Sequence, residues 1–392
     1  MDPPGENPTP SRERASLGQF VRYFLGLGTW GFGGPIATVG YMQRDLVERR
    51  QWVRREEFLN GVALGQTMPG PLAAQVVMWI GYLQAGSLGA LATVLPFVLP
   101  SFLLVLGVAV AYVQFKGLEA IQALFYGIAP AVMAVLAVAA VKLARLTNER
   151  DARLWVITLA IGVVTAATGT EVAFLFVGAG LVMMVWEAPP RFLQRSEPAL
   201  VFAAPVTHSL VTGILTGGGL ITLGLFFLKA GAFIFGSGLA IVPFLRSGVV
   251  EQHHWLTDRQ FLDAVAIGLI TPGPVVITAT FIGYLVGGFA GAAIATVAIF
   301  VPIYLGVVVP GRWFVRHKDS PRLRGFVKGA TAAAAGAIAG ATAVLARGAI
   351  VDWPTAGIAL VSLAFLLRFK NREPVLVLLA AVAGLALHPL AA

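Results

Sequence analysis

The sequence predicts an all-α polytopic membrane protein, built as an inverted-topology repeat of two homologous halves whose helices are broken by glycine and proline. Three observations predict this fold class: an apolar composition, an internal duplication, and basic loops that alternate between the halves. Of 392 residues, 57% are hydrophobic and 12% are charged, and the mean hydropathy is +0.82. Because soluble domains are about 25% charged, this composition excludes an ordinary soluble enzyme, a disordered chain and a fibrous protein.

The duplication extends over nearly the whole chain. Residues 24–71 align without gaps with residues 227–274, and 18 of these 48 positions are identical. The tripeptide Pro69-Gly70-Pro71 recurs as Pro272-Gly273-Pro274, and after a one-residue deletion the match continues towards the end of each half. Such self-similarity indicates duplicated structural units. We therefore expect a disordered N-terminal tail over 1–19, a first transporter repeat over 20–198, a connecting membrane helix over 199–222, and a second, inverted repeat over 223–392.

Apolar segments follow one another in the same order in both halves. The first half carries them at about 22–40, 60–83, 88–114, 120–141, 154–168 and 172–186, and the second near 225–245, 263–285, 289–311, 325–346, 350–367 and 374–390. The stretch 200–222 adds one more between the halves. Several of these segments are shorter than the roughly 20 residues that a straight membrane span needs.

The basic residues predict how the halves are oriented. The Lys and Arg residues differ between four pairs of equivalent loops, the first-half loop being given first. The counts are five in 40–57 against two in 243–260, and one in 110–122 against five in 312–324. They are four in 142–153 against one in 344–355, and none in 166–171 against three in 368–373. Cytoplasmic loops are the ones enriched in Lys and Arg. Because the bias reverses at every pair, the halves should lie in opposite orientations. The segment 200–222 then supplies the odd crossing that this inversion requires.

The same counts predict re-entrant segments. Loops 40–57 and 142–153 both look cytoplasmic, whereas three full spans between them would place them on opposite sides. The number of crossings between these loops becomes even if 60–83 is a re-entrant hairpin bent at Pro69-Gly70-Pro71. Segment 22–40 is similarly expected to bend at Gly33-Gly34-Pro35. The alternative is kinked but complete spans with an imperfect charge bias.

The breaks also suggest an anion site. A helix that restarts after Pro71 or Pro274 presents unpaired N–H groups and the positive end of its dipole, which bind anions without a charged side chain. In an inverted repeat, two such restarts should meet near the bilayer midplane. The alternative is bending for packing alone. The expected substrate-binding groups are Gly33, Gly34, Gln66, Thr67, Pro69, Gly70, Pro71, Gln75, Gly236, Ser237, Gly238, Thr271, Pro272, Gly273, Pro274 and Thr278, with Thr280 nearby.

Few charged residues interrupt the apolar segments. Lys229 lies in an apolar run, where it would either neutralise a bound dianion or extend to the membrane interface. Arg44, Glu48, Arg246 and Glu251 are candidates for coupling or gating, and ordinary salt bridges are the alternative for the two glutamates. The chain has no cysteine and no histidine spacing typical of a metal site. We expect no catalytic residues, metal, cofactor or nucleic-acid partner.

Four stretches resemble the paired signatures of the chromate ion transporter family: FGGP, MPGPLAAQVVMWIGYLQAG, FLKAGAFIFGSGLAIVPFLRSGVV and LITPGPVVITATFIGYLVGG. The resemblance covers both repeats, as in the long, two-domain form. It implies export of chromate from the cytoplasm driven by the proton motive force, with sulfate as a similar dianion. It places within family motifs the residues Pro69, Gly70, Pro71, Gln75, Lys229, Gly236, Gly238, Pro272, Gly273 and Pro274. Leu269 and Ile270 depart from the glutamine expected there, since the first half has Gln66-Thr67.

The sequence therefore predicts a secondary transporter in a bacterial-type inner membrane, with a tetrahedral oxyanion, protons and the lipid bilayer as partners. Two rival transport functions stay open: an uptake permease for sulfate or another oxyanion, and a passive anion channel. A membrane-embedded enzyme would need paired intramembrane carboxylates or histidines, which are not evident in the sequence. The oligomeric state is also open, with a homodimer as one alternative.

Overall fold

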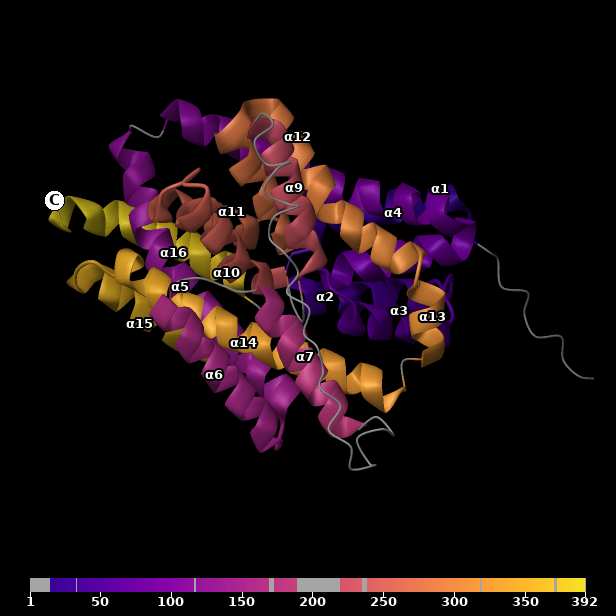
Figure 1. Cartoon of the computed structure of the whole chain (residues 1–392). Helices are drawn as coiled ribbons and strands as arrows, with labels where there is room; N and C mark the ends of the chain where they lie inside the picture. Colours follow the sequence, from indigo (N-terminus) through magenta and orange to yellow (C-terminus); the bar gives the residue numbers. More distant parts are fainter. Residues whose placement is uncertain are drawn as a thin grey trace, which may run out of the picture.

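The computed structural model describes residues 15–32, 34–115, 118–168, 173–188, 219–234, 238–317, 319–369 and 372–391, and the regular elements in these ranges are helices (Figure 1). The first half comprises α1 (Leu17–Trp30), α2 (Gly34–Met42), η1 (Gln43–Arg49), α3 (Arg55–Thr67), α4 (Leu72–Phe115), α5 (Glu119–Asn148), α6 (Ala152–Thr168) and α7 (Ala173–Glu187). The second comprises α9 (Gly219–Ala232), η3 (Gly238–Ala240), α10 (Ile241–Arg246), η4 (Ser247–Gln252), α11 (Asp258–Ile270), η5 (Val275–Ile277), α12 (Thr278–Val308), α13 (Gly311–His317), α14 (Pro321–Ala349), α15 (Trp353–Arg368) and α16 (Glu373–Ala391).

The first helices of the chain form a hairpin. The Tyr23 hydroxyl on α1 donates a hydrogen bond to Asp45 on η1 at 3.5 Å, and the rings of Phe20 and Trp52 lie 5.4 Å apart, so the two arms run antiparallel. Gly34 at the turn has a φ of +76°, which glycine adopts without steric cost. The predicted bend at this position is therefore observed.

A second hairpin is bent at Pro69-Gly70-Pro71. The Trp79 indole on α4 donates to the carbonyl of Glu57 at the start of α3, at 3.0 Å, so residues 72–84 run back along α3. The 13 residues of α3 reach about 20 Å, less than the hydrocarbon thickness of about 30 Å. The chain therefore turns back at this tripeptide, and residues 55–84 are not two complete spans.

Two glycines divide the longest helices. Gly86 in α4 and Gly288 in α12 share a φ of +61° and a ψ of −147°, and the residue before each glycine is also non-helical. Beyond the first break the chain reverses, because the Thr93 hydroxyl donates to the carbonyl of Val77, sixteen residues earlier, at 3.1 Å. Identical angles at equivalent positions show that both halves fold by the same local geometry.

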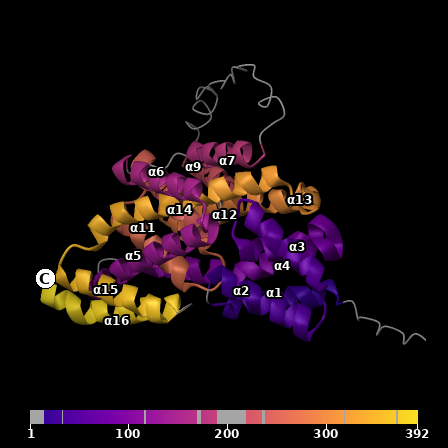
Figure 2. The ribbon, with the colours of Figure 1, turned by 90° about the horizontal axis from the view of Figure 1, so that it is seen from below.

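The two halves exchange their C-terminal helices. In the described chain α5 packs against α15 and α16 of the second half, while α14 packs against α6 and α7 of the first. Two glycines permit this close packing: a Cβ on Gly127 would overlap the carbonyl oxygen of Ala380, and one on Gly329 would overlap that of Ala179. Figures 1 and 2 show α1, α2, α3 and the start of α4 on one side of the molecule and α5, α15 and α16 on the other. The end of α4 reaches across to α5, where the rings of Tyr112 and Phe125 lie 5.5 Å apart.

The helix ends confirm that the halves are inverted. Lys328 near the start of α14 lies 3.4 Å from Glu187 at the end of α7. The start of α14 and the end of α7 therefore lie on the same side of the molecule. At the opposite ends, the Tyr126 hydroxyl near the start of α5 donates to Asp352, just after α14, at 2.6 Å. The equivalent helices α5 and α14 therefore run in opposite directions, as the alternating charge predicts.

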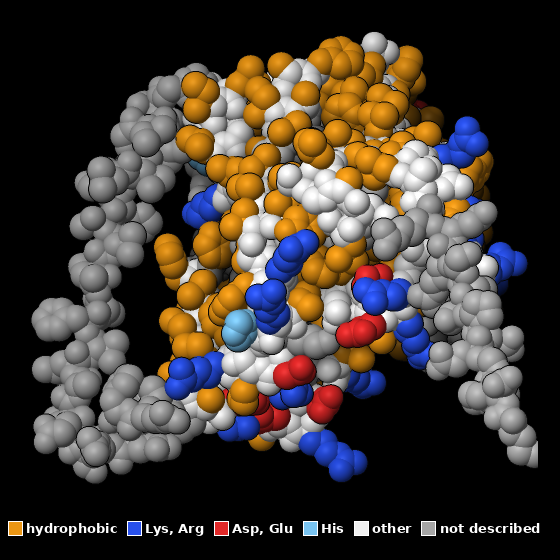
Figure 3. Space-filling view, turned by 90° about the vertical axis from the view of Figure 1, so that its right-hand side faces the viewer, with side chains coloured by type: hydrophobic (Ala, Val, Ile, Leu, Met, Phe, Trp, Pro, Cys, Tyr) orange, Lys and Arg blue, Asp and Glu red, His pale blue; other side chains and the backbone are white. Residues whose placement is uncertain are grey.

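The surface is that of a multi-pass membrane protein. Four helical stretches are long and apolar enough to cross a bilayer: Leu72–Phe115, Glu119–Asn148, Val275–Val308 and Pro321–Ala349. On α15, Leu360 and Val361 are 69% and 70% exposed, as expected for side chains that face lipid. Figure 3 shows hydrophobic side chains over most of one face and charged side chains gathered towards one end.

Two predicted boundaries differ from the structure. Helix α1 begins at Leu17, because Ser16 and Gln19 form a reciprocal capping box, so the predicted tail over 1–19 ends too late. Helix α9 begins at Gly219, inside the segment 199–222 that was expected to be a separate connecting helix. Residues 199–218 of that segment lie outside the described residues, as do residues 1–14.

Candidate substrate-binding site at the helix breaks

Each Pro-Gly-Pro break is held by the opposite half of the chain. The N–H of Gly70 donates to the carbonyl of Ile234, which follows α9 in the second half, at 2.6 Å. The hydroxyl of Ser101 on α4 donates to the carbonyl of Pro272. The structure therefore brings the breaks at 69–71 and 272–274 to the interface between the halves.

The packing at this interface is pseudo-symmetric. A Cβ on Gly70 would lie 2.9 Å from Cγ2 of Ile303, and a Cβ on Gly273 would overlap Oγ of Ser101. Ser101 and Ile303 are equivalent positions, each directly after a helix proline. Each break therefore contacts the repeat-equivalent position of the other half, as expected for two inverted units around one site.

The helix that restarts after the first break offers backbone donors. The Pro71 carbonyl accepts from the Gln75 N–H at 3.1 Å, which is the first intrahelical bond of α4. The N–H groups of residues 72–74 thus have no acceptor within the helix, and the positive end of its dipole lies beside them. In the second half, the Pro274 carbonyl accepts from the Ile277 N–H at 3.0 Å at the start of η5.

Gln75 maintains the shape of the first break. Its side chain is fully buried, and Nε2 donates to the carbonyls of Pro69 at 2.9 Å and Met68 at 3.4 Å. These bonds satisfy carbonyls that the interrupted helix leaves without partners. Oε1 of Gln75 is buried with no hydrogen-bond partner among the described residues, which is uncommon for a buried polar atom.

The threonine hydroxyls beside the breaks are engaged by the backbone. Thr67 donates to Ala63 at 2.9 Å, Thr271 to Gly268 at 3.4 Å and Thr278 to Val275 at 2.8 Å. Thr280 shares a hydrogen bond with Thr296 at 2.7 Å, and Gln66 is exposed. Among the described residues, these four threonine hydroxyls therefore already have acceptors in this conformation. The predicted site residues Gly33, Gly236 and Ser237 lie outside the described residues.

The candidate charged residues contact groups other than the Pro-Gly-Pro tripeptides. Lys229 is exposed on α9, with Nζ 5.8 Å from the centre of the Phe244 ring, so its observed contact is a cation–π interaction. Arg44 is also exposed, 3.6 Å from Asp45, and Glu48 accepts from Gln43 at 3.1 Å.

Arg246 is the buried member of this group. Its guanidinium pairs with Glu251 and with Asp258, the latter at 2.8 Å, and joins η4 to the first turn of α11. Glu251 therefore takes part in a salt bridge, the alternative left open for it, and its role in gating stays a prediction. Within the described ranges, no group of three or more His, Asp or Glu side chains is placed to hold a metal ion.

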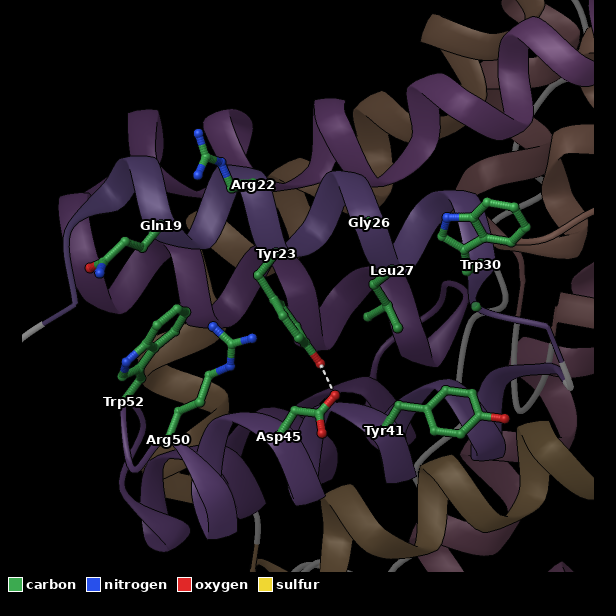
Figure 4. Close-up of a pocket in the computed structure, with 11 residues that line it drawn as sticks. Gln19, Arg22, Tyr23, Gly26, Leu27, Trp30, Tyr41, Asp45, Arg50 and Trp52 are labelled. Atoms are coloured by element: carbon green, nitrogen blue, oxygen red, sulfur yellow. Dashed lines mark hydrogen bonds between the residues drawn. The ribbon is translucent and has the colours of Figure 1, made fainter.

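An open cavity of about 650 Å³, lined by both polar and apolar residues, lies between α1 and η1 (Figure 4). Tyr23, Asp45 and Arg50 line it, and the Arg50 guanidinium lies 4.6 Å from the centre of the Trp52 ring. In the second half the residues equivalent to Tyr23 and Asp45 are Phe226 and Gly248. A Cβ on Gly248 would overlap the Phe226 ring, so this ring packs directly against the glycine. The sequence did not predict this difference between the halves.

Sequence reasoning also missed a buried acid. Asp263 on α11 is 3% exposed, and its Oδ2 accepts a hydrogen bond from the hydroxyl of Tyr112 at 2.8 Å. A signal was present, since Asp263 is the one charged residue in the apolar segment 263–285, and charges in such segments are seldom incidental. Ser101 had a weaker signal, a lone hydroxyl directly after Pro100.

Two inverted halves that meet at paired helix breaks define a multi-pass α-helical membrane protein with an inverted-repeat architecture, which is found in transporters. A family model described as chromate transporter matches residues 18–185 and 221–385, one match for each half. The chain belongs to the chromate transporter family.

Relatives cover almost the full chain. The chromate transport protein of Cupriavidus metallidurans is 50% identical over 377 residues, which is 96% of this chain and 94% of that protein. A probable chromate transport protein of Synechococcus elongatus is 46% identical over 94% of this chain and 95% of its own length. The chromate transport protein of Pseudomonas aeruginosa is 32% identical over 95% and 92%. No solved structure matches the chain.

Proposed function

We propose that this protein exports chromate from the cytoplasm across the inner membrane of a bacterium, as a secondary transporter coupled to the proton motive force. The observation that carries the proposal is the placement of both Pro-Gly-Pro breaks at the interface of the halves, each anchored by the opposite half. The printed names of relatives at 50% and 46% identity support chromate as the substrate.

Backbone donors suit a small tetrahedral dianion. Each oxygen of chromate accepts hydrogen bonds, and helix N-termini supply N–H groups with a partial positive charge. Backbone dipoles carry only partial charges, so an anion held by them is released more easily than one held by a full positive charge. On this proposal the substrate contacts come from the residues after Pro71 and Pro274, with Gln75 holding the first break in shape.

The inverted repeat suggests how access alternates. Two halves of the same fold in opposite orientations allow an inward-facing and an outward-facing state that are related by the pseudo-symmetry. Movement of one half against the other would shift the contacts that Gly70 and Pro272 make across the interface. On this proposal the chain is a transporter and not an enzyme.

The test is transport of radiolabelled chromate in everted membrane vesicles, with and without an imposed pH gradient and with sulfate as competitor. Export predicts chromate accumulation inside everted vesicles that depends on the gradient and is abolished by a protonophore. Flux that ignores the gradient would instead identify a passive anion channel. Accumulation only in right-side-out vesicles, competed by sulfate, would identify an uptake permease.

A further inference from the structure

Asp263 is a buried carboxyl group within the second Pro-Gly-Pro hairpin. It lies on α11 with 3% of its surface exposed. Burial of a carboxylate costs free energy unless the charge is paired and hydrogen bonded, so an acid at such a position is commonly part of an ion or proton pathway. None of the contacts proposed for chromate uses it.

The surroundings of Asp263 contain little charge. Its hydrogen-bond donor is the Tyr112 hydroxyl on α4, at 2.8 Å, and Arg259 one turn earlier on α11 acts on it electrostatically from an exposed position. The elements α5, α10, α12, α14, α16, η4 and η5 also pack against α11. Their titratable residues, which include Arg246 on α10 and Glu251 on η4, are not among the electrostatic partners of Asp263 in the described chain. Among the described residues, Asp263 therefore has one hydrogen-bond donor and no close ion pair, so a proton is the cation best placed to neutralise it.

The pair has no titratable counterpart in the other half. By the repeat alignment, Asp263 corresponds to Asn60 and Tyr112 corresponds to Phe314. These residues keep the size of the pair but cannot exchange a proton at neutral pH. The fold is duplicated, whereas this chemistry occurs once, which indicates a role other than packing.

The position of the pair connects it with the substrate site. Asp263 lies seven residues before Ile270, the last residue of α11, a distance of about 10 Å along the helix axis, and Pro272 follows two residues later. Tyr112 borders a cavity of about 200 Å³ that Phe125 and Ile267 also line, which leaves space beside its ring. A change of charge on Asp263 would therefore act on the helix that ends at the second break.

We propose that Asp263 is the group that takes up and releases the coupling proton, and that Tyr112 is its positioning residue. In each cycle a proton from outside adds to the carboxylate oxygen of Asp263 and leaves to the cytoplasm, while chromate moves outward. The Tyr112 hydroxyl donates to the carboxylate when the proton is absent. This inference rests on the proposed function as a proton-coupled chromate transporter.

The decisive variant is Asp263→Asn, assayed in proteoliposomes in two ways. The amide keeps the size of the side chain and an oxygen that accepts from Tyr112, but it cannot carry a proton. We expect chromate accumulation driven by a pH gradient to fall at least tenfold, while chromate–chromate exchange without a gradient stays within twofold of wild type. Asp319→Asn, which changes an exposed acid in a loop, is the matched control and should leave both activities unchanged.

Tyr112→Phe supplies an independent readout. Loss of the donor removes stabilisation of the charged carboxylate, so the pH profile of gradient-driven transport should move towards higher pH, and exchange should persist. Gradient-driven accumulation at the wild-type level in Asp263→Asn would overturn the inference. Loss of exchange as well in this variant would also overturn it, because Asp263 would then be needed for binding or folding. If the wild type itself exchanges chromate but ignores the gradient, the proposed coupling fails instead.

Discussion

Replacement of Gly70 by alanine tests whether the first break has to adopt its observed shape. Gly70 has a φ of +141°, which side-chain-bearing residues rarely adopt. The added Cβ would lie 2.8 Å from Nε2 of Gln75 and 2.9 Å from Cγ2 of Ile303. It would therefore push on the amide that satisfies the carbonyls of the break and on the opposite half at the same time.

The magnitude follows from backbone strain and crowding. A non-glycine residue in such a conformation costs about 1–3 kcal/mol, and overpacking of a tight contact costs a similar amount. A shift of about 2 kcal/mol corresponds to roughly a thirtyfold change in the population of the native break. We therefore expect chromate transport by Gly70→Ala to fall by about tenfold or more at equal membrane insertion.

The assay is chromate accumulation in everted vesicles, normalised to the protein inserted, together with thermal unfolding in detergent. Gly273→Ala should show the same loss, because φ is +99° and the new Cβ would overlap Ser101. Gly107→Ala, on α4 with open space around the added Cβ, should behave as wild type. Normal transport and normal stability in Gly70→Ala and Gly273→Ala would refute the break-site model.

Three further changes have expected outcomes. Arg246→Ala removes a mostly buried cation from Glu251 and from the half-exposed Asp258 and should cost about 1–3 kcal/mol, seen as reduced insertion and a lower Tm, whereas the exposed Arg44→Ala should change the Tm little. Burial, and then a nearby lysine, hold the pKa of His253 below its ordinary value. As the pH falls, this histidine is therefore protonated at a higher pH in the unfolded chain than in the folded protein. The free energy of unfolding should decrease as the pH drops below about 6.5. His253→Phe keeps an aromatic ring that can stack on the neighbouring tryptophan, and it should make the loss of stability between pH 7.5 and 5.5 smaller. The measurement is the Tm at these two pH values, and an unchanged difference in Tm would contradict the assignment. Gly127→Ala places a Cβ against the backbone of α16 and should lower the Tm by several degrees, whereas Gly178→Ala has open space and should not; equal Tm values for these two would count against the exchanged packing of the helices.

The hairpins were predictable because they change the number of membrane crossings between two loops that are rich in Lys and Arg. A loop has to lie on one side of the membrane, so five Lys or Arg in 40–57 and four in 142–153 exclude an odd number of crossings between them. The Pro-Gly-Pro tripeptide then indicated where the chain turns back, and the Trp79–Glu57 hydrogen bond confirms the turn.

The individual contacts of the site were less predictable. The sequence pointed to Gln75 and to threonines beside the breaks, but a side chain's partner depends on which carbonyls lie within reach. Gln75 donates to the break itself, and Thr67 and Thr278 donate to their own helical turns. Hydroxyl groups in helices commonly form such local bonds, and sequence spacing does not distinguish them from ligands.

By itself, the sequence determined the duplicated membrane architecture, the inversion of the halves and the position of the breaks, because composition, repetition and charge parity are properties of the chain read in order. Only the tertiary structure decided that α5 and α14 exchange partners between halves, that Ser101 anchors the opposite break, and that Tyr112 meets Asp263. These contacts join residues more than 150 positions apart. Their formation depends on how two inverted units pack around a common axis, and no local pattern in the sequence records that packing.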